Sequence, residues 1–274
     1  MDIQIVFSED PALALRRAGA FLASEPVLHN LILTLLHTRL KQPEPGRYWI
    51  ALDRNQAAGV VLQSPPDFPA TLTPMEPRVI AVMVDAIAKA GVSLPGINGD
   101  AATAANFAGR WTERRQSAAT PFQGSRLYEC VEVGDAPRIG GRLRQALPAD
   151  GGMLIHWTHA FLAEIGERVH DAELRVERAL AAGQLWLWDD DGPASMALSR
   201  EPVEGVVRLA GVYTPADKRK RGYAGACVGA LTKRLREAEY RCVLYTDLGN
   251  PTSNSIYRRI GYKAVAEALR YRFG

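Results

Sequence analysis

The stretch "RKRGYAGA", Arg219–Ala226, decides the fold of this chain. It sets basic side chains against glycine, tyrosine and alanine, and it sits between two different apolar patterns. The residues before it, "GVYT", predict a strand that ends at Thr214, and a helix is expected from Ala224 to Tyr240. The basic residues are therefore expected in a loop that leads from a strand into a helix N-terminus.

This loop is suited to binding an anion. A helix N-terminus presents backbone N–H groups without partners and a partial positive charge, which together stabilise a phosphate. Gly222 lets the backbone turn sharply, and the small side chains of Ala224 and Gly225 leave the helix start uncluttered. Arg219 and Arg221 can add charge-assisted hydrogen bonds. A solvated basic loop, or a patch that contacts nucleic acid, would explain the charges alone.

Two familiar phosphate-binding patterns do not fit these residues. A Walker A loop ends in Gly-Lys-Ser/Thr, and a dinucleotide fingerprint needs G-x-G-x-x-G. Gly222, Gly225 and Gly229 match neither spacing. Nucleoside triphosphates and nicotinamide dinucleotides are therefore not the expected ligands.

A second motif, "NPTSNSIYRRIGY", follows at Asn250–Tyr262 after another predicted strand. It contains an Asn, a Ser three residues later, a Tyr seven residues later and a Gly-aromatic pair. With the run Arg219–Ala224, it resembles the two signatures of the GCN5-related N-acetyltransferase (GNAT) superfamily, R/Q-x-x-G-x-G/A being the first. The resemblance covers roughly residues 138–274, and two motifs in the right order are more specific than either one.

The resemblance implies that the chain binds acetyl-CoA and acetylates an amine. The strand end would pair with the pantetheine arm, a backbone N–H of Val212 or Tyr213 would polarise the thioester carbonyl, and the loop would hold the pyrophosphate. Tyr257 would protonate the departing thiolate, because a phenol is still protonated at neutral pH. The residues that the resemblance assigns to the coenzyme are Val212, Tyr213, Thr214, Arg219, Lys220, Arg221, Gly222, Tyr223, Ala224, Asn250 and Ser253.

Several of these residues also have a purely structural explanation. Asn250 before Pro251 is a favourable N-cap followed by proline at the first helical position, and one residue can both cap a helix and contact a ligand. Gly261 can end a helix whatever the function. Tyr257 can be a core residue, as aromatic residues at helical spacing usually are.

The general base is left open by the sequence. An acceptor amine must lose a proton before it attacks, and the candidates are Glu164, Glu167 and Asp247. His156 and His159 share a helical face, but no third ligand accompanies them, so no metal is expected.

The chain reads as two α/β domains, residues 1–135 and 136–274, joined within the glycine- and proline-rich stretch Gly134–Gly152. The resemblance implies that the second is an acyltransferase fold with a mostly antiparallel central sheet, splayed at the coenzyme site. In the first, "LPGINGDAATAANFAGRW" suggests a degenerate copy, because a glycine-rich turn precedes a helix there but no basic coenzyme loop is present. A tandem arrangement in which only the second copy holds coenzyme is expected.

Composition is that of a soluble globular protein. The 274 residues are 47% hydrophobic and 23% charged, with a net charge of +3 that is too small to imply a nucleic-acid or membrane partner. No secretory signal or membrane-spanning run is visible, so a cytoplasmic protein is expected. Cys130, Cys227 and Cys242 fit neither a disulfide framework nor a zinc site.

The leading hypothesis is therefore direct acetyl transfer from acetyl-CoA to a small-molecule or peptide amine, with no metal. The alternative is a non-catalytic protein of the same fold that binds acyl-CoA as a regulatory ligand. A nucleic-acid partner is disfavoured because the basic residues form one short loop instead of a broad stripe. The sequence identifies neither the acceptor nor the oligomeric state.

Overall fold

The computed structural model of the chain describes residues 3–134, 139–166 and 171–274. The chain divides into two compact units. The first unit contains residues 1–127, 246–249 and 264–274, and the second contains residues 128–245 and 250–263.

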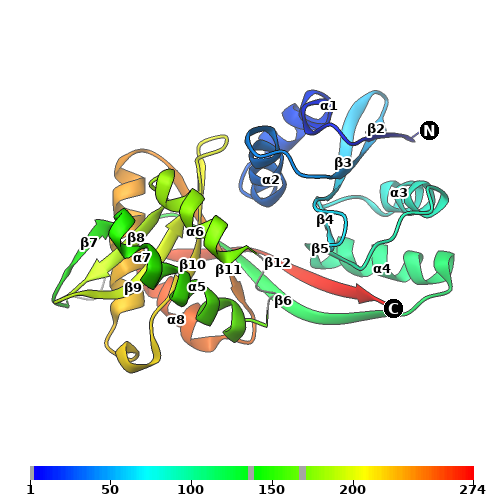
Figure 1. The fold of residues 1–274 in the computed structure, drawn as a ribbon. Coiled ribbons are helices and arrows are strands. Elements are labelled where there is room, and N and C mark those ends of the chain that lie inside the picture. Colours follow the sequence, from blue (N-terminus) through cyan, green and yellow to red (C-terminus); the bar gives the residue numbers. More distant parts are fainter. Residues whose placement is uncertain (1–2, 135–138, 167–170) are drawn as a thin grey trace. The chain divides into compact units, whose positions relative to one another are not determined.

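The first half of the chain supplies most of the first unit (Figure 1). Its elements in order are β1 (Ile3–Ser8), α1 (Pro11–Ser24), α2 (Asn30–Lys41), β2 (Arg47–Asp53), β3 (Gln56–Gln63), β4 (Ala70–Leu72), α3 (Pro77–Lys89), β5 (Gly96–Asp100), α4 (Ala101–Arg115) and β6 (Ala119–Cys130).

The second half repeats this order. Its elements are β7 (Arg142–Gln145), α5 (Gly151–Glu164), α6 (Ala172–Ala181), β8 (Leu185–Asp189), β9 (Pro193–Ser199), β10 (Val206–Tyr213), α7 (Tyr223–Glu237), β11 (Arg241–Asp247), α8 (Pro251–Ile260) and β12 (Tyr262–Phe273). Short 3-10 turns at Pro148–Asp150 and Ala216–Lys218 precede α5 and α7.

Strand pairing repeats with the element order. Neighbouring strands run β1-β2-β3-β4-β5 in the first half and β7-β8-β9-β10-β11 in the second. Each series is antiparallel except for its last pair, because β4 is parallel to β5 and β10 is parallel to β11. The two halves are therefore copies of one mixed α/β arrangement, as the sequence predicts for the second half and suggests for the first.

The last strand of each half serves the other half's sheet. Leu269 of β12, drawn in red in Figure 1, pairs antiparallel with Gly99 of β5 in the first unit. In the second unit, the end of β6 lies beside β11. The two halves have thus exchanged their final strands.

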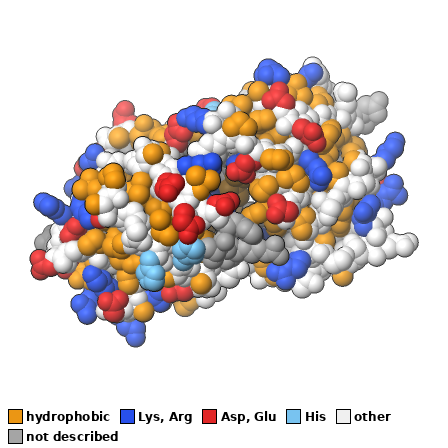
Figure 2. Space-filling model, in the orientation of Figure 1, with side chains coloured by type: hydrophobic (Ala, Val, Ile, Leu, Met, Phe, Trp, Pro, Cys, Tyr) orange, Lys and Arg blue, Asp and Glu red, His pale blue; other side chains and the backbone are white. Residues whose placement is uncertain are grey.

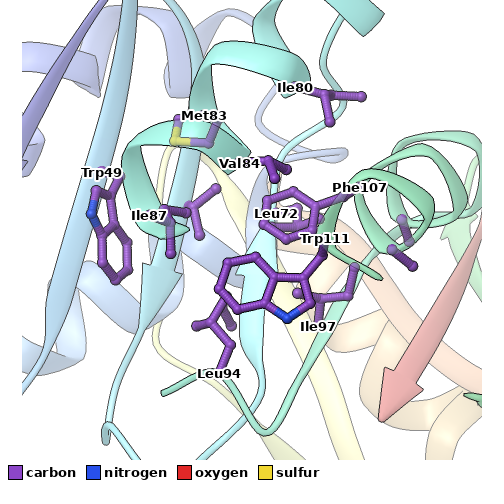
Figure 3. Close-up of a cluster of buried hydrophobic side chains, with 14 of the residues drawn as sticks. Trp49, Leu72, Ile80, Met83, Val84, Ile87, Leu94, Ile97, Phe107 and Trp111 are labelled. Carbon is purple, nitrogen blue, oxygen red and sulfur yellow. The ribbon is translucent and has the colours of Figure 1, made fainter. Parts of the chain in front are cut away.

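The core of the first unit lies between its sheet and helices α3 and α4 (Figure 3). Met83, Val84 and Ile87 of α3 meet Phe107 and Trp111 of α4 over the strands. All five side chains are almost completely buried. Burial of such large apolar groups contributes about 1.5–3 kcal/mol each, so this cluster is a main source of the unit's stability.

The second unit has a core on each face of its sheet. On one face, Cys227 and Leu231 of α7 and Tyr257 of α8 pack on Val207 and Leu209 of β10. On the other face, apolar residues of α5 and α6 pack on β8 and β9, and these are Leu154, Trp157, Val176, Leu187 and Met196. The sheet is therefore covered by α7 and α8 on one side and by α5 and α6 on the other.

All three cysteines are free and buried. Burial raises the pKa of Cys227 and of Cys242 to about 12. A thiolate is the reactive form of cysteine, so both thiols are unreactive at neutral pH.

Strands β2 and β3 form a hairpin, and its turn residues Arg54 and Asn55 both have positive φ, as a tight two-residue turn requires. The stretch predicted to be a linker, Gly134–Gly152, instead contains the edge strand β7, which pairs with β8. None of the helices in the described ranges has the length and apolar character needed to span a bilayer.

Candidate functional site

Strands β10 and β11 separate halfway along their length. Their parallel pairing runs from Val206↔Arg241 to Leu209↔Leu244, although β10 continues to Tyr213. A register shift against β9 begins after Ala210 and is the mark of a β-bulge. Gly211 adopts φ +57° in this bulge, a left-handed conformation that glycine tolerates best. The backbone of β10 beyond the bulge is thus free of β11, as the predicted splayed sheet requires.

Side chains hold the free end of β10 in place. The buried Ser195 hydroxyl donates to the carbonyl oxygen of Tyr213 at 3.0 Å, and the Thr214 hydroxyl donates to Ser195 Oγ at 2.9 Å. The carbonyl of Tyr213 is therefore already satisfied within the protein. The carbonyl of Thr214 is engaged as well, because it accepts from Arg219 Nε at 2.9 Å.

The basic loop ends in a strongly turned backbone. Lys220 has φ +63° and Gly222 has φ +88°, and Gly222 is the N-cap of α7. The N-cap provides no side-chain hydrogen bond to the helix. The first intrahelical bond in this turn is donated by the N–H of Ala226 to the carbonyl of Gly222 at 3.0 Å. The N–H groups of the preceding residues are therefore the donors that a helix N-terminus presents to an anion.

Arg219 is held by other parts of the second unit. Its Nε donates to the Thr214 carbonyl at 2.9 Å, and its Nη2 pairs with Glu164 Oε1 on α5. The guanidinium also lies over the Tyr213 ring, 5.7 Å from the centroid. This side chain braces the loop against the strand and α5.

Tyr223 also makes a structural contact. Its hydroxyl donates to Asp190 Oδ2 at 2.7 Å, and this hydrogen bond raises the pKa of the phenol. Lys220 and Arg221 are exposed at the tip of the loop. They are the basic side chains of the motif with most freedom to meet a ligand.

The second motif forms the start of α8. Asn250 Oδ1 accepts from the N–H of Ser253 at 2.9 Å, so the predicted N-cap is present. Asn254, which the sequence did not single out, is buried and bonds the Asn250 carbonyl through Nδ2 at 2.7 Å. Its Oδ1 accepts from the Tyr128 hydroxyl at 2.9 Å. The capping asparagine is thereby fixed to the core, and ligand contact by Asn250 and Ser253 stays a prediction.

Tyr257 lies on the buried face of α8 in the core formed with α7. It is 8% exposed, and its ring meets the Tyr262 ring edge-on at 6.1 Å. Burial, reinforced by the neighbouring Cys227, raises the pKa of the phenol to about 12. Both readings of the sequence are thus compatible with its position: the ring packs in the core, and the hydroxyl is a protonated donor at neutral pH.

The structure places the three candidate bases differently. Glu164 is engaged with Arg219, and Glu167 lies outside the described residues. Asp247 Oδ1 accepts from the N–H of Gly249 at 2.6 Å, which is a turn-forming contact. Glu164 is therefore a poor free base, and of the two described candidates neither Glu164 nor Asp247 is singled out by its geometry.

Histidine and acidic residues do not gather into a metal site. His159 pairs with Glu173 at 3.0 Å through Nε2. Within residues 3–134, 139–166 and 171–274, no group of three His, Cys, Asp or Glu side chains could hold a metal ion.

The corresponding place in the first unit is built differently. Only Thr73–Glu76 separate β4 from α3, which begins with Pro77 and has Glu76 as its N-cap. Proline offers no N–H, and a carboxylate repels a phosphate. A Cβ on Gly99 of β5 would lie 2.9 Å from the Leu72 side chain of β4, so these strands stay in close contact. Element order also aligns "LPGINGD" with the start of α8, since Asp100 caps α4 as Asn250 caps α8.

Comparisons with known proteins agree with this architecture. A model of the FR47-like protein family matches residues 196–271, whereas no curated protein matches the chain. A GNAT-family acetyltransferase from Colwellia psychrerythraea superposes with a TM-score of 0.65, at 10% identity over 100% of both chains. A GCN5-related N-acetyltransferase from Sphaerobacter thermophilus gives 0.63, at 15% identity over 98% of this chain and 95% of that one. A tandem GNAT protein from the clavulanic acid biosynthesis pathway gives 0.54, at 10% identity over 100% and 98%.

The fold is that of the GCN5-related N-acetyltransferases, as the resemblance implies. The chain carries the fold twice in sequence order, which is the arrangement that the resemblance suggested.

Proposed function

We propose that the second unit transfers an acetyl group from acetyl-CoA to an amine. The observation that carries the proposal is the splay of β10 from β11, which opens beside a glycine-capped helix N-terminus. A free strand edge suits the amide-bearing pantetheine arm, and the N-terminus of α7 suits the pyrophosphate. The first unit supports the fold and binds no coenzyme, because Glu76 and Pro77 occupy its equivalent helix start.

The backbone would make most of the coenzyme contacts. The N–H groups of Tyr223, Ala224 and Gly225 at the start of α7 would bind phosphate oxygens, with Lys220 and Arg221 adding charge. Arg219 serves the site indirectly, by holding the loop to Thr214 and Glu164.

The reaction requires one charge to be stabilised and one proton to be delivered. As the amine attacks the thioester carbonyl, negative charge develops on its oxygen, and a backbone N–H of the bulged strand at Val212 or Tyr213 would stabilise it. The C–S bond then breaks, and Tyr257 donates its phenolic proton to the leaving thiolate. The amine would lose its proton to solvent, since Glu164 is paired with Arg219 and Asp247 accepts from the N–H of Gly249.

The face of the protein drawn in Figure 2 supports a small acceptor over nucleic acid. Lys and Arg side chains alternate with Asp and Glu on this face, and the described residues form no continuous basic stripe there. A polyanion would be expected to need such a stripe.

Thermal unfolding with acetyl-CoA, CoA and a short DNA duplex tests coenzyme binding. Ligands that bind only the folded state raise the unfolding midpoint, so both CoA species should raise it and DNA should not. A screen of amines followed by thiol release then tests turnover. If neither acetyl-CoA nor CoA raises the unfolding midpoint, the proposal is wrong. Binding of CoA without turnover of any amine would favour the regulatory alternative.

Gly222→Glu tests the proposed phosphate site. An added carboxylate at the helix start should abolish the shift given by acetyl-CoA. Gly205→Glu is a matched control, because Gly205 also has positive φ (+72°) but lies in the turn before β10 with open space around it. Both variants carry similar backbone strain. Loss of the acetyl-CoA-induced shift in Gly222→Glu, with the shift retained in Gly205→Glu, would therefore indicate that the phosphates bind at the N-terminus of α7.

A further inference from the structure

Arg208 and Arg200 lie opposite each other on neighbouring strands of the second unit. The N–H of Arg200 donates to the carbonyl of Arg208 at 2.9 Å, next to the paired residues Leu209 and Ser199. Directly opposed residues have Cβ atoms about 4.5–5.5 Å apart, and like charges there are destabilising. Nothing in the fold of β9 and β10 requires two arginines at this position.

The two arginines face the α5–α6 side of the sheet. Side chains alternate along a strand, so Arg200 shares a face with Leu198 and Met196, which pack with Trp157 of α5 and Val176 of α6. On the opposite face, Val207 and Leu209 pack with α7 and α8. The cationic pair is therefore on the face that does not carry the coenzyme-binding helix α7.

Among the residues that the structure describes, no carboxylate forms an ion pair with either arginine. Arg208 is half-buried, and its Nε is inaccessible to solvent and has no hydrogen-bond partner among the described residues. Burial and the charge of Arg200 lower the pKa of Arg208, while burial and the charge of Arg175 on α6 lower that of Arg200. Leaving a buried charged donor such as Arg208 Nε unpaired costs free energy that a bound anion would recover.

Arg208 lies close to the point where β10 and β11 separate. Arg208 pairs with Val243, one step before the last paired residues of β10 and β11. Tyr245 follows on the same face, where β11 has left β10. The arginines therefore lie at the base of the opening in which the proposed thioester would react.

We propose that Arg208 and Arg200 bind the carboxylate of the acyl acceptor, so that the acceptor is a small amine bearing a carboxylate, such as an amino acid. This inference rests on the proposed function and specifies its substrate class. A carboxylate between Arg208 and Arg200 neutralises their repulsion and satisfies the free Nε donor. Its neighbouring amine is then held close to the splayed end of β10.

Matched acceptors test the charge of the substrate. Thiol release from acetyl-CoA is measured with a panel of amino acids and with the amide of each. The amino acids should have a KM about 10- to 100-fold lower than the amides, as expected for a charge-assisted hydrogen bond. Equal or better turnover of the amides overturns the inference while leaving the proposed function intact. Failure to bind acetyl-CoA contradicts the proposed function instead.

Single-residue variants test whether the two arginines bind the carboxylate of the acceptor. Arg208→Gln and Arg200→Gln should each raise the KM for the amino acid about 10- to 100-fold, with little change for the amide and an unchanged thermal shift with acetyl-CoA. Lys233→Gln makes the same charge change on the exposed face of α7, where the Lys233 side chain is 69% exposed, and should leave both KM values unchanged. An equal loss with amino acid and amide in the arginine variants would refute a carboxylate site.

Binding without turnover provides an independent measurement. N-acetyl amino acids should raise the unfolding midpoint of the CoA complex more than their amides do, and Arg208→Gln should remove that difference. If the two ligands stabilise the wild-type complex equally, the arginines do not bind a carboxylate.

Discussion

Arg219 of the basic loop and Glu164 at the end of α5 form an ion pair, with 2.5 Å between Nη2 and Oε1. The pair joins two residues to which the sequence assigned separate roles, one as a phosphate contact and the other as a candidate base. Both side chains are more than two-fifths exposed, so the pair contributes only about 0–1 kcal/mol to stability. The ion pair instead matters because it holds the basic loop against α5.

Glu164→Gln should separate a bracing role from a catalytic one. Loss of the ion pair frees Arg219, so the KM for acetyl-CoA should rise a few-fold, about what a weak exposed pair can supply. Turnover at saturating acetyl-CoA should persist. Steady-state kinetics with both substrates measure this, and a fall in kcat of about 10²-fold or more would restore Glu164 as the general base.

Gly211→Ala should damage catalysis through the bulge of β10. An alanine at φ +57° costs about 1–2 kcal/mol, although its Cβ would have ordinary contact with Leu198 at 3.7 Å. The strand should relax toward a regular ladder and misplace the N–H groups that face the thioester. Gly205→Ala carries a similar backbone cost outside the site. We expect similar unfolding midpoints for the two variants and reduced kcat for Gly211→Ala alone; equal kcat values would show that the bulge is only structural.

Tyr257→Phe should preserve acetyl-CoA affinity and reduce kcat by about 10²- to 10⁴-fold. The hydroxyl is lost while the ring and its contact with Tyr262 remain. Because the pKa of Tyr257 is about 12, the wild-type enzyme should show no loss of activity from deprotonation of this residue between pH 6 and about pH 10. Titration calorimetry and a pH profile of kcat check both points, and unchanged turnover would remove Tyr257 from the mechanism.

Arg144→Gln should destabilise the second unit in a pH-dependent way. Arg144 of β7 pairs with Asp150 before α5 at 2.7 Å and with Asp189 of β8, and its hydrogen bonds lower the pKa of both carboxyls. A lowered folded pKa stabilises the protein above the unfolded value near 4, and this stability is lost as the pH falls through the folded pKa. The variant should lose about 1–3 kcal/mol at pH 7.

Urea unfolding across a pH series measures this difference. It should shrink steadily below about pH 4, as both carboxyls become protonated in the wild type. A difference that stays constant down to pH 2 would mean that Arg144 stabilises the unit by packing and not by charge.

Much of the second half could be predicted because its elements carry local signals. The cap at Asn250 and the glycine of the loop at Gly222 each depend on a few neighbouring residues. Strand β7 could not be recognised, since its four residues lie among glycines and prolines and it is stabilised by pairing with β8. Strand β4, of three residues, is similarly a product of its neighbours.

The site was predictable in its backbone and less so in its side chains. Gly222 and the strand end follow from motif and order, whereas the contacts of Arg219 and Tyr223 involve Glu164 and Asp190, which are distant in sequence. Arg208 and Arg200 gave no signal, because only the register of β9 against β10 sets them opposite each other.

The exchanged strands have a consequence for biosynthesis. When the ribosome has made β5, the neighbour that will flank it in the native sheet, β12, has not yet been translated. The edge of β5 stays unpaired until β12 has been synthesised. The first unit therefore starts to be synthesised before the second unit but can be completed only after it. Non-local pairing of this kind is slow and leaves an unpaired strand exposed meanwhile. We therefore expect the nascent first half to need protection from aggregation until synthesis reaches Phe273.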